Sequence, residues 1–229
     1  MTTLKVVDRM ASSFTSIQQA IDEANDGDII KLEPDVYEEE KLIINKSLSI
    51  KGIGKRQDVN LMNGLRIKTN GKVKIENITI KGSTSGGVDI IHGNVHINHC
   101  HIKHNKKFGI TAFENTELLL ENSTIENNDI GMNILGKATV DSAHFSENNG
   151  MCQIRVGENG QTDIYYSTIE NGQRGVGYLK RANGLIHSTN IRNNKEFQLT
   201  VLENSSVKLI ESNIFPGAYK GIFIKRSNA

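Results

Sequence analysis

Apolar residues recur along this chain at intervals of 20 to 24 residues, far longer than the period of a single helix or strand. Such an interval indicates a solenoid, in which each repeat buries its apolar face only by stacking on its neighbours. The clearest column of equivalent positions holds Ile80, Ile102, Ile125, Phe145, Ile169, Ile191 and Ile214. A second column, five residues earlier in each repeat, holds Ile75, Ile97, Leu120, Val140, Ile164, Ile186 and Leu209.

Two further columns follow after a turn and stand two residues apart, the spacing at which side chains of a strand share one face. A leucine-rich repeat has a similar length, but it would need a leucine-dominated segment and a helical or irregular return arm. The sequence therefore predicts an all-β fold, a right-handed parallel β-helix with three-strand coils of about 22–23 residues. The two columns are Val88, Ile110, Met132, Cys152, Val176, Leu199 and Ile222, and Ile90, Ala112, Ile134, Ile154, Tyr178, Val201 and Ile224.

Asparagine and glycine follow the isoleucine column in five of the repeats, at residues 103–105, 126–128, 146–149, 170–172 and 192–194. Both residue types tolerate the left-handed backbone of a sharp bend. Asparagine side chains stacked coil over coil can also hydrogen-bond along the solenoid axis. We therefore predict an asparagine ladder with a structural role.

The repeat runs without a break from Val73 to Ile224, which predicts a single β-helix domain over residues 1–229. Within it, we expect irregular N-terminal coils over residues 28–70 and seven regular coils over residues 71–226.

The N-terminus differs in kind from the repeats. The segment from Thr15 to Gln18 has the form of a capping box, and apolar residues follow at helical spacing. This pattern predicts a short helix over residues 14–25 that covers the end of the solenoid, where strand edges would otherwise be exposed. No such helix is expected after Ile222 and Ile224, so we predict end-to-end association through an uncapped C-terminal coil, or another partner that covers it.

Composition excludes several classes of function. With 27 Lys and Arg against 26 Asp and Glu, the net charge of +1 gives no electrostatic footprint for nucleic acid or an anionic membrane. No apolar run is long enough to span a bilayer, and no signal-peptide stretch follows Met1. We therefore expect a cytoplasmic protein as the sequence stands, or a secreted one from which a leader has been removed. Cys100 and Cys152 fall in different inward columns and are expected to be buried free thiols.

The N-terminal part resembles the opening of the pectin-lyase-like β-helix proteins. The superfamily includes pectin methylesterases, polygalacturonases, pectate lyases and repeat domains associated with carbohydrate binding and sugar hydrolysis. Together with the repeats, the resemblance covers nearly the whole chain, and it implies the fold more strongly than an activity. The resembling segments are residues 14–21, 27–32, 36–37 and 42–52.

The resemblance implies a substrate groove along the outer face of the strand that precedes the first turn of each coil. Two outward columns lie on this strand. In that register Glu121 and Asp141 are adjacent, and Asp163 lies one coil further on. Paired carboxylates suit a general acid beside a base or nucleophile, or share a hard cation such as calcium. Exposed strand faces also carry charged residues for solubility alone. The columns are Glu76, Asn98, Glu121, Asp141, Tyr165 and His187, and Lys74, His96, Leu119, Thr139, Asp163, Leu185 and Lys208.

The same columns supply four candidate ligand-binding residues, namely His96, Asn98, Tyr165 and His187. Tyr165 is followed by Tyr166 at a bend, where aromatic rings can stack on a sugar. Residues 96–104 contain four histidines around a cysteine, but on a coil their side chains diverge to different strands and turns. We therefore predict neither a metal site there nor any resident cofactor.

Three functions remain open. The first is a noncatalytic recognition or scaffold module that presents a flat repetitive β-face to a polysaccharide or a protein partner. The second is a lyase or hydrolase of uronic-acid polymers that uses Glu121, Asp141 and Asp163. The third is an assembly element of a larger chain or fibre. The motifs that the resemblance implies for polygalacturonases and pectin methylesterases are absent in register, and the turns are too short to wall a deep cleft. The sequence therefore favours the first function.

Overall fold

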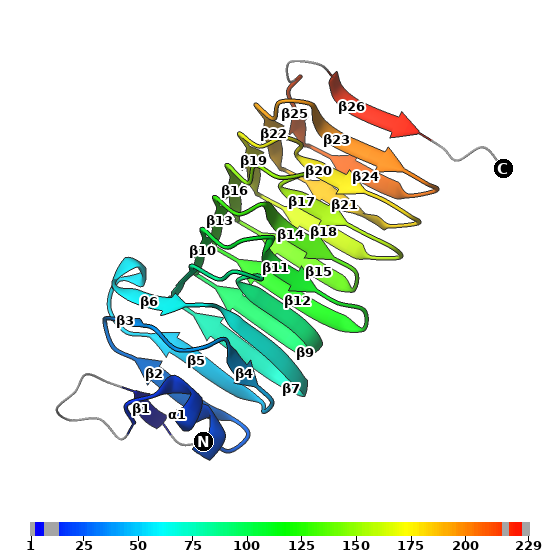
Figure 1. The fold of residues 1–229 in the computed structure, drawn as a ribbon. Helices are drawn as coiled ribbons and strands as arrows, with labels where there is room; N and C mark the ends of the chain where they lie inside the picture. The colour runs from blue at the N-terminus through cyan, green and yellow to red at the C-terminus, as the bar shows by residue number, and fades with distance from the viewer. Residues whose placement is uncertain (1–2, 7–13, 217–219, 226–229) are drawn as a thin grey trace.

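Parallel strands wind into an elongated solenoid with three faces (Figure 1). The computed structural model describes residues 3–6, 14–216 and 220–225. The predicted right-handed parallel β-helix is confirmed, and one short α-helix lies at its N-terminal end. Within the described residues, no helix combines the length and apolarity needed to cross a membrane.

Face 1 carries the strand that precedes the first bend of each coil. Its parallel partners follow one another in register along the axis. It comprises β1 (Thr3–Val6), β2 (Asp28–Leu32), β5 (Leu48–Gly52), the second halves of β7 (Leu65–Glu76) and β9 (Val88–Asn98), β12 (Thr116–Glu121), β15 (Lys137–Asp141), β18 (Gln161–Tyr165), β21 (Asn183–His187) and β24 (Ser206–Ile210).

Face 2 is a separate sheet of short strands, nine among the described residues, with one strand per coil. It comprises β3 (Asp35–Tyr37), β6 (Val59–Met62), which follows the 3-10 helix Arg56–Asp58, β8 (Thr79–Lys81), β10 (His101–Lys103), β13 (Thr124–Glu126), β16 (His144–Ser146), β19 (Thr168–Glu170), β22 (Asn190–Arg192) and β25 (Asn213–Ile214).

Face 3 closes each coil before the chain returns to face 1. The long strands β7 and β9 run through both faces, which joins faces 1 and 3 into one sheet. Face 3 comprises β4 (Leu42–Ile44), the first halves of β7 and β9, β11 (Phe108–Ala112), β14 (Ile130–Ile134), β17 (Ile154–Val156), β20 (Val176–Tyr178), β23 (Phe197–Leu202) and β26 (Lys220–Lys225).

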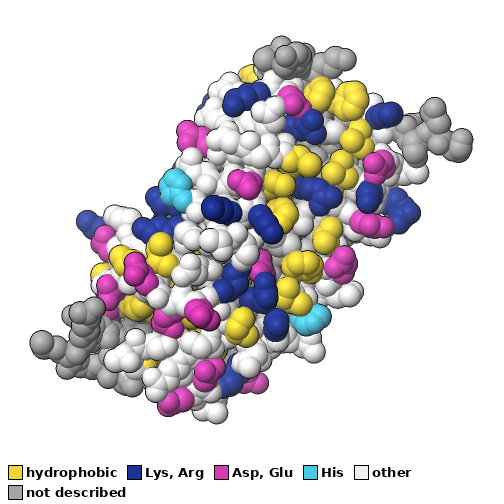
Figure 2. Space-filling model, in the orientation of Figure 1, with side chains coloured by type: hydrophobic (Ala, Val, Ile, Leu, Met, Phe, Trp, Pro, Cys, Tyr) yellow, Lys and Arg dark blue, Asp and Glu magenta, His cyan; other side chains and the backbone are white. Residues whose placement is uncertain are grey.

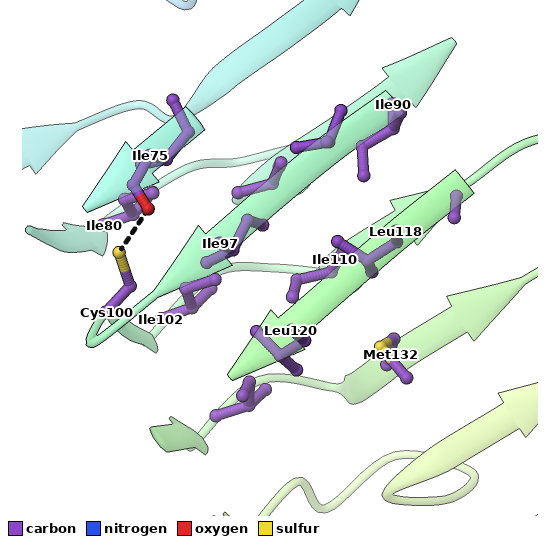
Figure 3. Packing of buried hydrophobic residues seen from close by; sticks show 14 of the residues in the cluster. Ile75, Ile80, Ile90, Ile97, Cys100, Ile102, Ile110, Leu118, Leu120 and Met132 are labelled. Carbon is purple, nitrogen blue, oxygen red and sulfur yellow. Dashed lines mark hydrogen bonds between the residues drawn. The ribbon is translucent and has the colours of Figure 1, made fainter. Parts of the chain in front are cut away.

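The core is the stack of inward columns that the periodicity predicts. Ile80, Ile102 and Ile125 lie opposite one another on successive strands, and each is fully buried. Figure 3 shows Ile80 and Ile102 among the buried apolar side chains that pack coil over coil. β-branched residues suit this arrangement because their side chains stack well on a pleated surface. The columns extend further toward the N-terminus than predicted, since Leu61 of β6 lies opposite Ile80.

One coil departs from the predicted register. Met132 pairs with Ile154, and Ile134 pairs with Val156, so the predicted placement of Cys152 and Ile154 in these columns is wrong by two residues. The turn before β17 is longer than its neighbours, and Cys152 lies in that turn. Cys152 is nevertheless buried, and both cysteines are free thiols.

The bend from face 1 to face 2 places one residue per coil in the left-handed conformation. Its backbone N–H donates to a carbonyl of the next coil, as Asn122 does to Asp141 and Tyr166 does to His187. Asparagine tolerates this conformation well, whereas a bulky tyrosine is an outlier there. The φ angles are Asn77 59°, His99 53°, Asn122 49°, Ser142 51°, Tyr166 46°, Ser188 48° and Glu211 48°.

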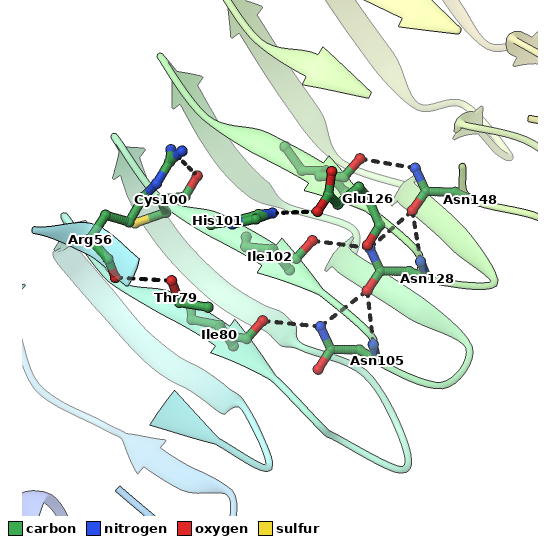
Figure 4. Close-up of polar contacts among 11 residues, drawn as sticks. Arg56, Thr79, Ile80, Cys100, His101, Ile102, Asn105, Glu126, Asn128 and Asn148 are labelled. Carbon is green, nitrogen blue, oxygen red and sulfur yellow. Dashed lines mark hydrogen bonds and ion pairs between the residues drawn. The ribbon is translucent and has the colours of Figure 1, made fainter. Parts of the chain in front are cut away.

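The asparagine ladder lies at the bend from face 2 to face 3. Asn105 donates from its backbone N–H and its side-chain amide to the side-chain oxygen of Asn128, at 3.0 and 3.1 Å. Asn128 makes the same two bonds to Asn148, at 3.0 and 2.9 Å, and all three residues are buried (Figure 4). Each amide also donates to an isoleucine carbonyl of the preceding coil. The ladder therefore satisfies backbone and side-chain groups that water cannot reach.

A glutamine side chain replaces the asparagine in the one coil of the ladder that has a glycine at this position, and we call this the repair of the ladder. Gly172 occupies the position above Asn148, and Gln153 fills the space that a side chain at Gly172 would take. Gln153 is fully buried, accepts from the amide of Asn148, and donates to the carbonyl of Glu170 at 2.5 Å. Gln198 has a similar role above Asn194, whose side-chain amide donates to it at 2.7 Å.

The helix α1 (Ile17–Glu23) is held at both ends by the first coils. Ser16 is its N-cap and accepts from Gln19, one residue later than the predicted capping box. The carboxylate of Glu39 accepts from the backbone N–H groups of Ile17 and Gln18, at 2.6 and 3.1 Å. At the other end, the amine of Lys46 donates to the carbonyls of Asp22 and Ala24, at 2.5 and 2.7 Å. An anion and a cation thus satisfy the free groups at the helix ends and complement its dipole.

The last described coil leaves apolar side chains exposed. Leu209 is 40% exposed, Ile222 44% and Ile224 65%, whereas their counterparts in inner coils are buried. A further coil or a second chain stacked on β24 and β26 would cover them. End-to-end association through this coil stays a prediction.

Truncating a core column should destabilise the whole stack. Ile125→Ala is expected to lower the free energy of unfolding by about 2–5 kcal/mol, because the cavity lies between coils that cannot collapse independently. Chemical denaturation measures this loss. An unchanged unfolding midpoint would contradict the inward position of this column.

The repair of the ladder predicts a compensating pair of substitutions. Gln153→Ala should cost about 1–3 kcal/mol, since it leaves the buried Asn148 amide without its acceptor. Gly172→Asn alone should also destabilise, because its Cβ would meet the Gln153 side chain. The double variant has room for the asparagine and should recover most of the lost stability in thermal and chemical unfolding. Additive losses in the double variant would contradict this account of Gln153.

Candidate functional site

A groove runs along the axis on face 1 of the described surface. It has a volume of about 830 Å³ and extends from β5 to β18, across six successive coils. It is lined by inward positions of these strands and by the two outward columns that contain Lys72 and Lys74. We call this hollow the axial groove. The charged and titratable residues that line it are Lys72, Lys74, His96, Glu117, Lys137 and Asp163.

The axial groove continues over the next two coils. A second hollow of about 420 Å³ lies over β18, β21 and β24, and Asp163 lines both hollows. Lys208 lines the far end of the second hollow. The two hollows give face 1 a continuous open path that suits a linear chain rather than a compact ligand.

The outward columns have the predicted register. Glu121 lies opposite Asp141, and Asp163 lies opposite Thr139 in the neighbouring column, one coil beyond Asp141. The three carboxylates have separate partners, however. The Asp141 carboxylate accepts from the Ser142 hydroxyl at 2.8 Å, and Asp163 accepts from the backbone N–H of Leu185 at 3.0 Å. A catalytic role for Glu121, Asp141 and Asp163 stays a prediction.

Glu121 instead pairs with His96. The distance from His96 Nε2 to Glu121 Oε2 is 2.5 Å, and both side chains are about one-third exposed. A carboxylate on one ring nitrogen fixes the orientation of an imidazole. His96 lines the axial groove, so this pair places an oriented imidazole beside any bound chain.

Asn98, another of the predicted ligand-binding residues, does not line the axial groove. Its side-chain oxygen accepts from the Asn122 amide at 3.0 Å. It lines a separate hollow of about 560 Å³ near the bend, together with Glu76. Hydrogen bonds from Lys74 and Lys51 hold the pKa of the Glu76 carboxyl below its usual range.

Tyr165 and His187 do come together, and Tyr166 joins them. Tyr165 and His187 are opposite residues of β18 and β21, with ring centroids 6.1 Å apart. The rings of Tyr166 and His187 meet edge to face, with centroids 5.8 Å apart. Tyr166 is 62% exposed. These three rings form an aromatic cluster beside the second hollow, at the bend toward face 2.

The histidine-rich segment does not converge on one point. His101 pairs with Glu126 on face 2, at 2.8 Å, and burial lowers the pKa of its ring (Figure 4). His99 and His104 occupy left-handed bends. Throughout the described ranges, no group of three or more His, Cys, Asp or Glu residues is placed to hold a metal ion. The calcium alternative stays a prediction.

Neither cysteine is placed for thiol chemistry. Burial raises the pKa of Cys100 to about 12 and that of Cys152 to about 12. Both therefore remain protonated and covered at neutral pH, as inert structural thiols do.

Lys72, Glu117 and Lys137 also line the groove and are not among the predicted site residues. They form a third outward column, two residues before the column that contains Lys74. The same period marks this column in the sequence, since Lys72, Asn94, Glu117, Lys137, Gln161, Asn183 and Ser206 occupy equivalent positions. Figure 2 shows that acidic and basic side chains are interspersed over the visible face.

Comparisons with known proteins agree with this fold. The model of the right handed beta helix region matches residues 46–150. A pectate lyase, Pel9A, superposes with a TM-score of 0.71 at 13% identity, covering 100% of this chain and 78% of the other. A pectin methylesterase from Aspergillus niger gives 0.70 at 12% identity, covering 100% and 90%. An alginate lyase of family PL6, AlyGC, gives 0.57 at 10% identity, covering 99% and 39%. A search of the curated proteins gives no match.

The chain is therefore a right-handed parallel β-helix protein of the pectin-lyase-like fold. The predicted resemblance is confirmed for the fold. At identities of 10–13%, the activities of these neighbours are not carried over with it.

Proposed function

We propose that this protein binds an acidic polysaccharide along the axial groove. The observation that carries the proposal is the set of lysines in the groove. Lys72 and Lys137 line the groove, and Lys208 lines its continuation. None of the three lysines forms an ion pair with a described residue. Lysines left free in a hollow are available to the carboxylates of a ligand.

The dimensions of the groove favour a linear polymer. Successive coils are about 4.8 Å apart, which is close to the length of one sugar ring, so each coil can face about one sugar. The axial groove and its continuation cover eight coils from β5 to β24. A chain in this path would meet His96 on the third of these eight strands and the aromatic cluster of Tyr165, Tyr166 and His187 near the far end.

The aromatic cluster supports a carbohydrate ligand in particular. The chain has 5% aromatic residues and no Trp, yet three rings meet here, and one of them is exposed in a left-handed bend. An exposed tyrosine in that conformation adds no core packing. An aromatic face can instead stack on the apolar face of a sugar ring, while its hydroxyl bonds to water or to a sugar hydroxyl.

Binding without catalysis fits the site better than turnover. The groove is open along its length, and none of the described segments forms a loop that closes over it to exclude water from a reacting bond. The candidate carboxylates have separate partners. A lyase or hydrolase remains the second candidate, because the neighbours by structure include two lyases and the His96–Glu121 pair offers an oriented imidazole.

Removing the free lysines should weaken binding to polygalacturonate, a polymer of uronic acids. The variant Lys72→Gln/Lys137→Gln/Lys208→Gln loses three exposed charge contacts, together worth about 1–3 kcal/mol, so its Kd should rise by about 5- to 150-fold. Titration calorimetry at low salt measures this. The matched control, Lys81→Gln/Lys103→Gln/Lys106→Gln, removes three lysines outside the groove and should bind as wild type does. Equal losses in both variants would contradict binding in the groove.

The second candidate is tested by turnover. We expect no cleavage of polygalacturonate or alginate by the wild-type protein, followed as new reducing ends or unsaturated products. Cleavage that disappears in Glu121→Gln/Asp141→Asn, or in Asp163→Asn, while circular dichroism stays unchanged, would replace the binding role with an enzymatic one.

A further inference from the structure

We propose that the groove selects an acidic polysaccharide whose negative charges are widely spaced, rather than one that carries a charge on every sugar. This inference rests on the proposed function and names the class of polymer that fits it. It follows from the order of charges along the groove.

The basic positions recur every three coils. Lys72 and Lys74 lie on β7, Lys137 lies on β15, and Lys208 lies on β24. Two strands of face 1, β9 and β12, separate the first position from the second, and β18 and β21 separate the second from the third. At about 4.8 Å per coil, the basic positions are about 14 Å apart.

Acidic side chains flank the central basic position on both sides. Glu117 of β12 lies opposite Lys137, and Asp163 of β18 lies opposite Thr139 of the same strand as Lys137. Over the described residues, neither carboxylate forms an ion pair with a lysine, arginine or histidine. Both line the groove, so both face a bound chain.

Amides lie on the two remaining strands, and on β9 His96, paired with Glu121, lines the groove as well. Asn94 of β9 and Asn183 of β21 line the groove and its continuation. Apart from the paired His96, the strands from β7 to β24 therefore present basic, amide, acidic, basic, acidic, amide and basic side chains in that order. This pattern is symmetrical about Lys137.

A chain with a carboxylate on every sugar would set negative groups against Glu117 and Asp163. At physiological salt, charges are screened over about 8 Å, so a ligand carboxylate opposite Glu117 or Asp163 feels this close repulsion, and Lys137, which lies one coil from both acids, offsets it only in part. A chain with charges about three sugars apart would place its carboxylates at the lysines. Its uncharged sugars would then lie against the acidic side chains and amides, which can bond to their hydroxyls.

The test uses a series of polygalacturonates from fully charged to fully methyl-esterified, titrated into the protein with a chelator present to prevent cation bridges. Wild type should bind an intermediate member most tightly. Glu117→Gln/Asp163→Asn should raise affinity for the fully charged polymer by about tenfold, since each removed repulsion is worth up to about fivefold. The amide oxygen that Asp163→Asn introduces still accepts from the Leu185 N–H. The matched control, Glu114→Gln/Glu147→Gln, removes two exposed acids outside the groove and should not shift the optimum.

The outcomes separate this inference from the function beneath it. Tightest binding of wild type to the fully charged polymer, unchanged by Glu117→Gln/Asp163→Asn, would overturn the charge-spacing inference and leave polysaccharide binding intact. Absence of binding to every member of the series would overturn both.

Discussion

Coil-over-coil stacking is the constraint on which the rest of this structure depends. Each coil is too small to enclose a core, so its inward residues are buried only because the same positions in the neighbouring coils cover them. Stacking therefore demands an apolar residue at the same position in every coil, as the column of isoleucines with Phe145 shows. It also sets every outward column in register, and this is how side chains far apart in the sequence come to line one groove.

The stacking creates buried polar groups at each bend, and the structure satisfies them with side chains that repeat at the same period. The asparagine ladder does this at the bend toward face 3. A second ladder of hydroxyls does it at the bend toward face 2, where Ser123, Ser167 and Thr189 each accept from a backbone N–H of the preceding coil. Gln153 shows how strongly the pattern is required, since a residue from elsewhere in the turn supplies the missing group.

The period made the fold and the outward columns predictable, because residues at equivalent positions of successive repeats lie opposite one another on adjacent strands. Prediction failed where spacing changed. The long turn before β17 contains Cys152, so Ile154 takes the position opposite Met132 that was predicted for Cys152. The spacing of apolar residues cannot show how many extra residues a turn contains. The contacts within the groove were harder to predict. The adjacency of Glu121 and Asp141 follows from the period, but the ion pair between Glu121 and His96 depends on side-chain conformation. The same period could have identified Lys72 and Lys137 as members of one outward column.

The most direct test of the account is to map where an acidic oligosaccharide contacts the protein, by backbone NMR chemical-shift changes on titration with oligogalacturonates. The account predicts changes along face 1 from β7 to β24, including Lys72, Lys137 and Tyr166, with faces 2 and 3 unaffected. Changes confined to face 2 or face 3, or to the exposed residues of the last coil, would contradict the assignment of function to the groove.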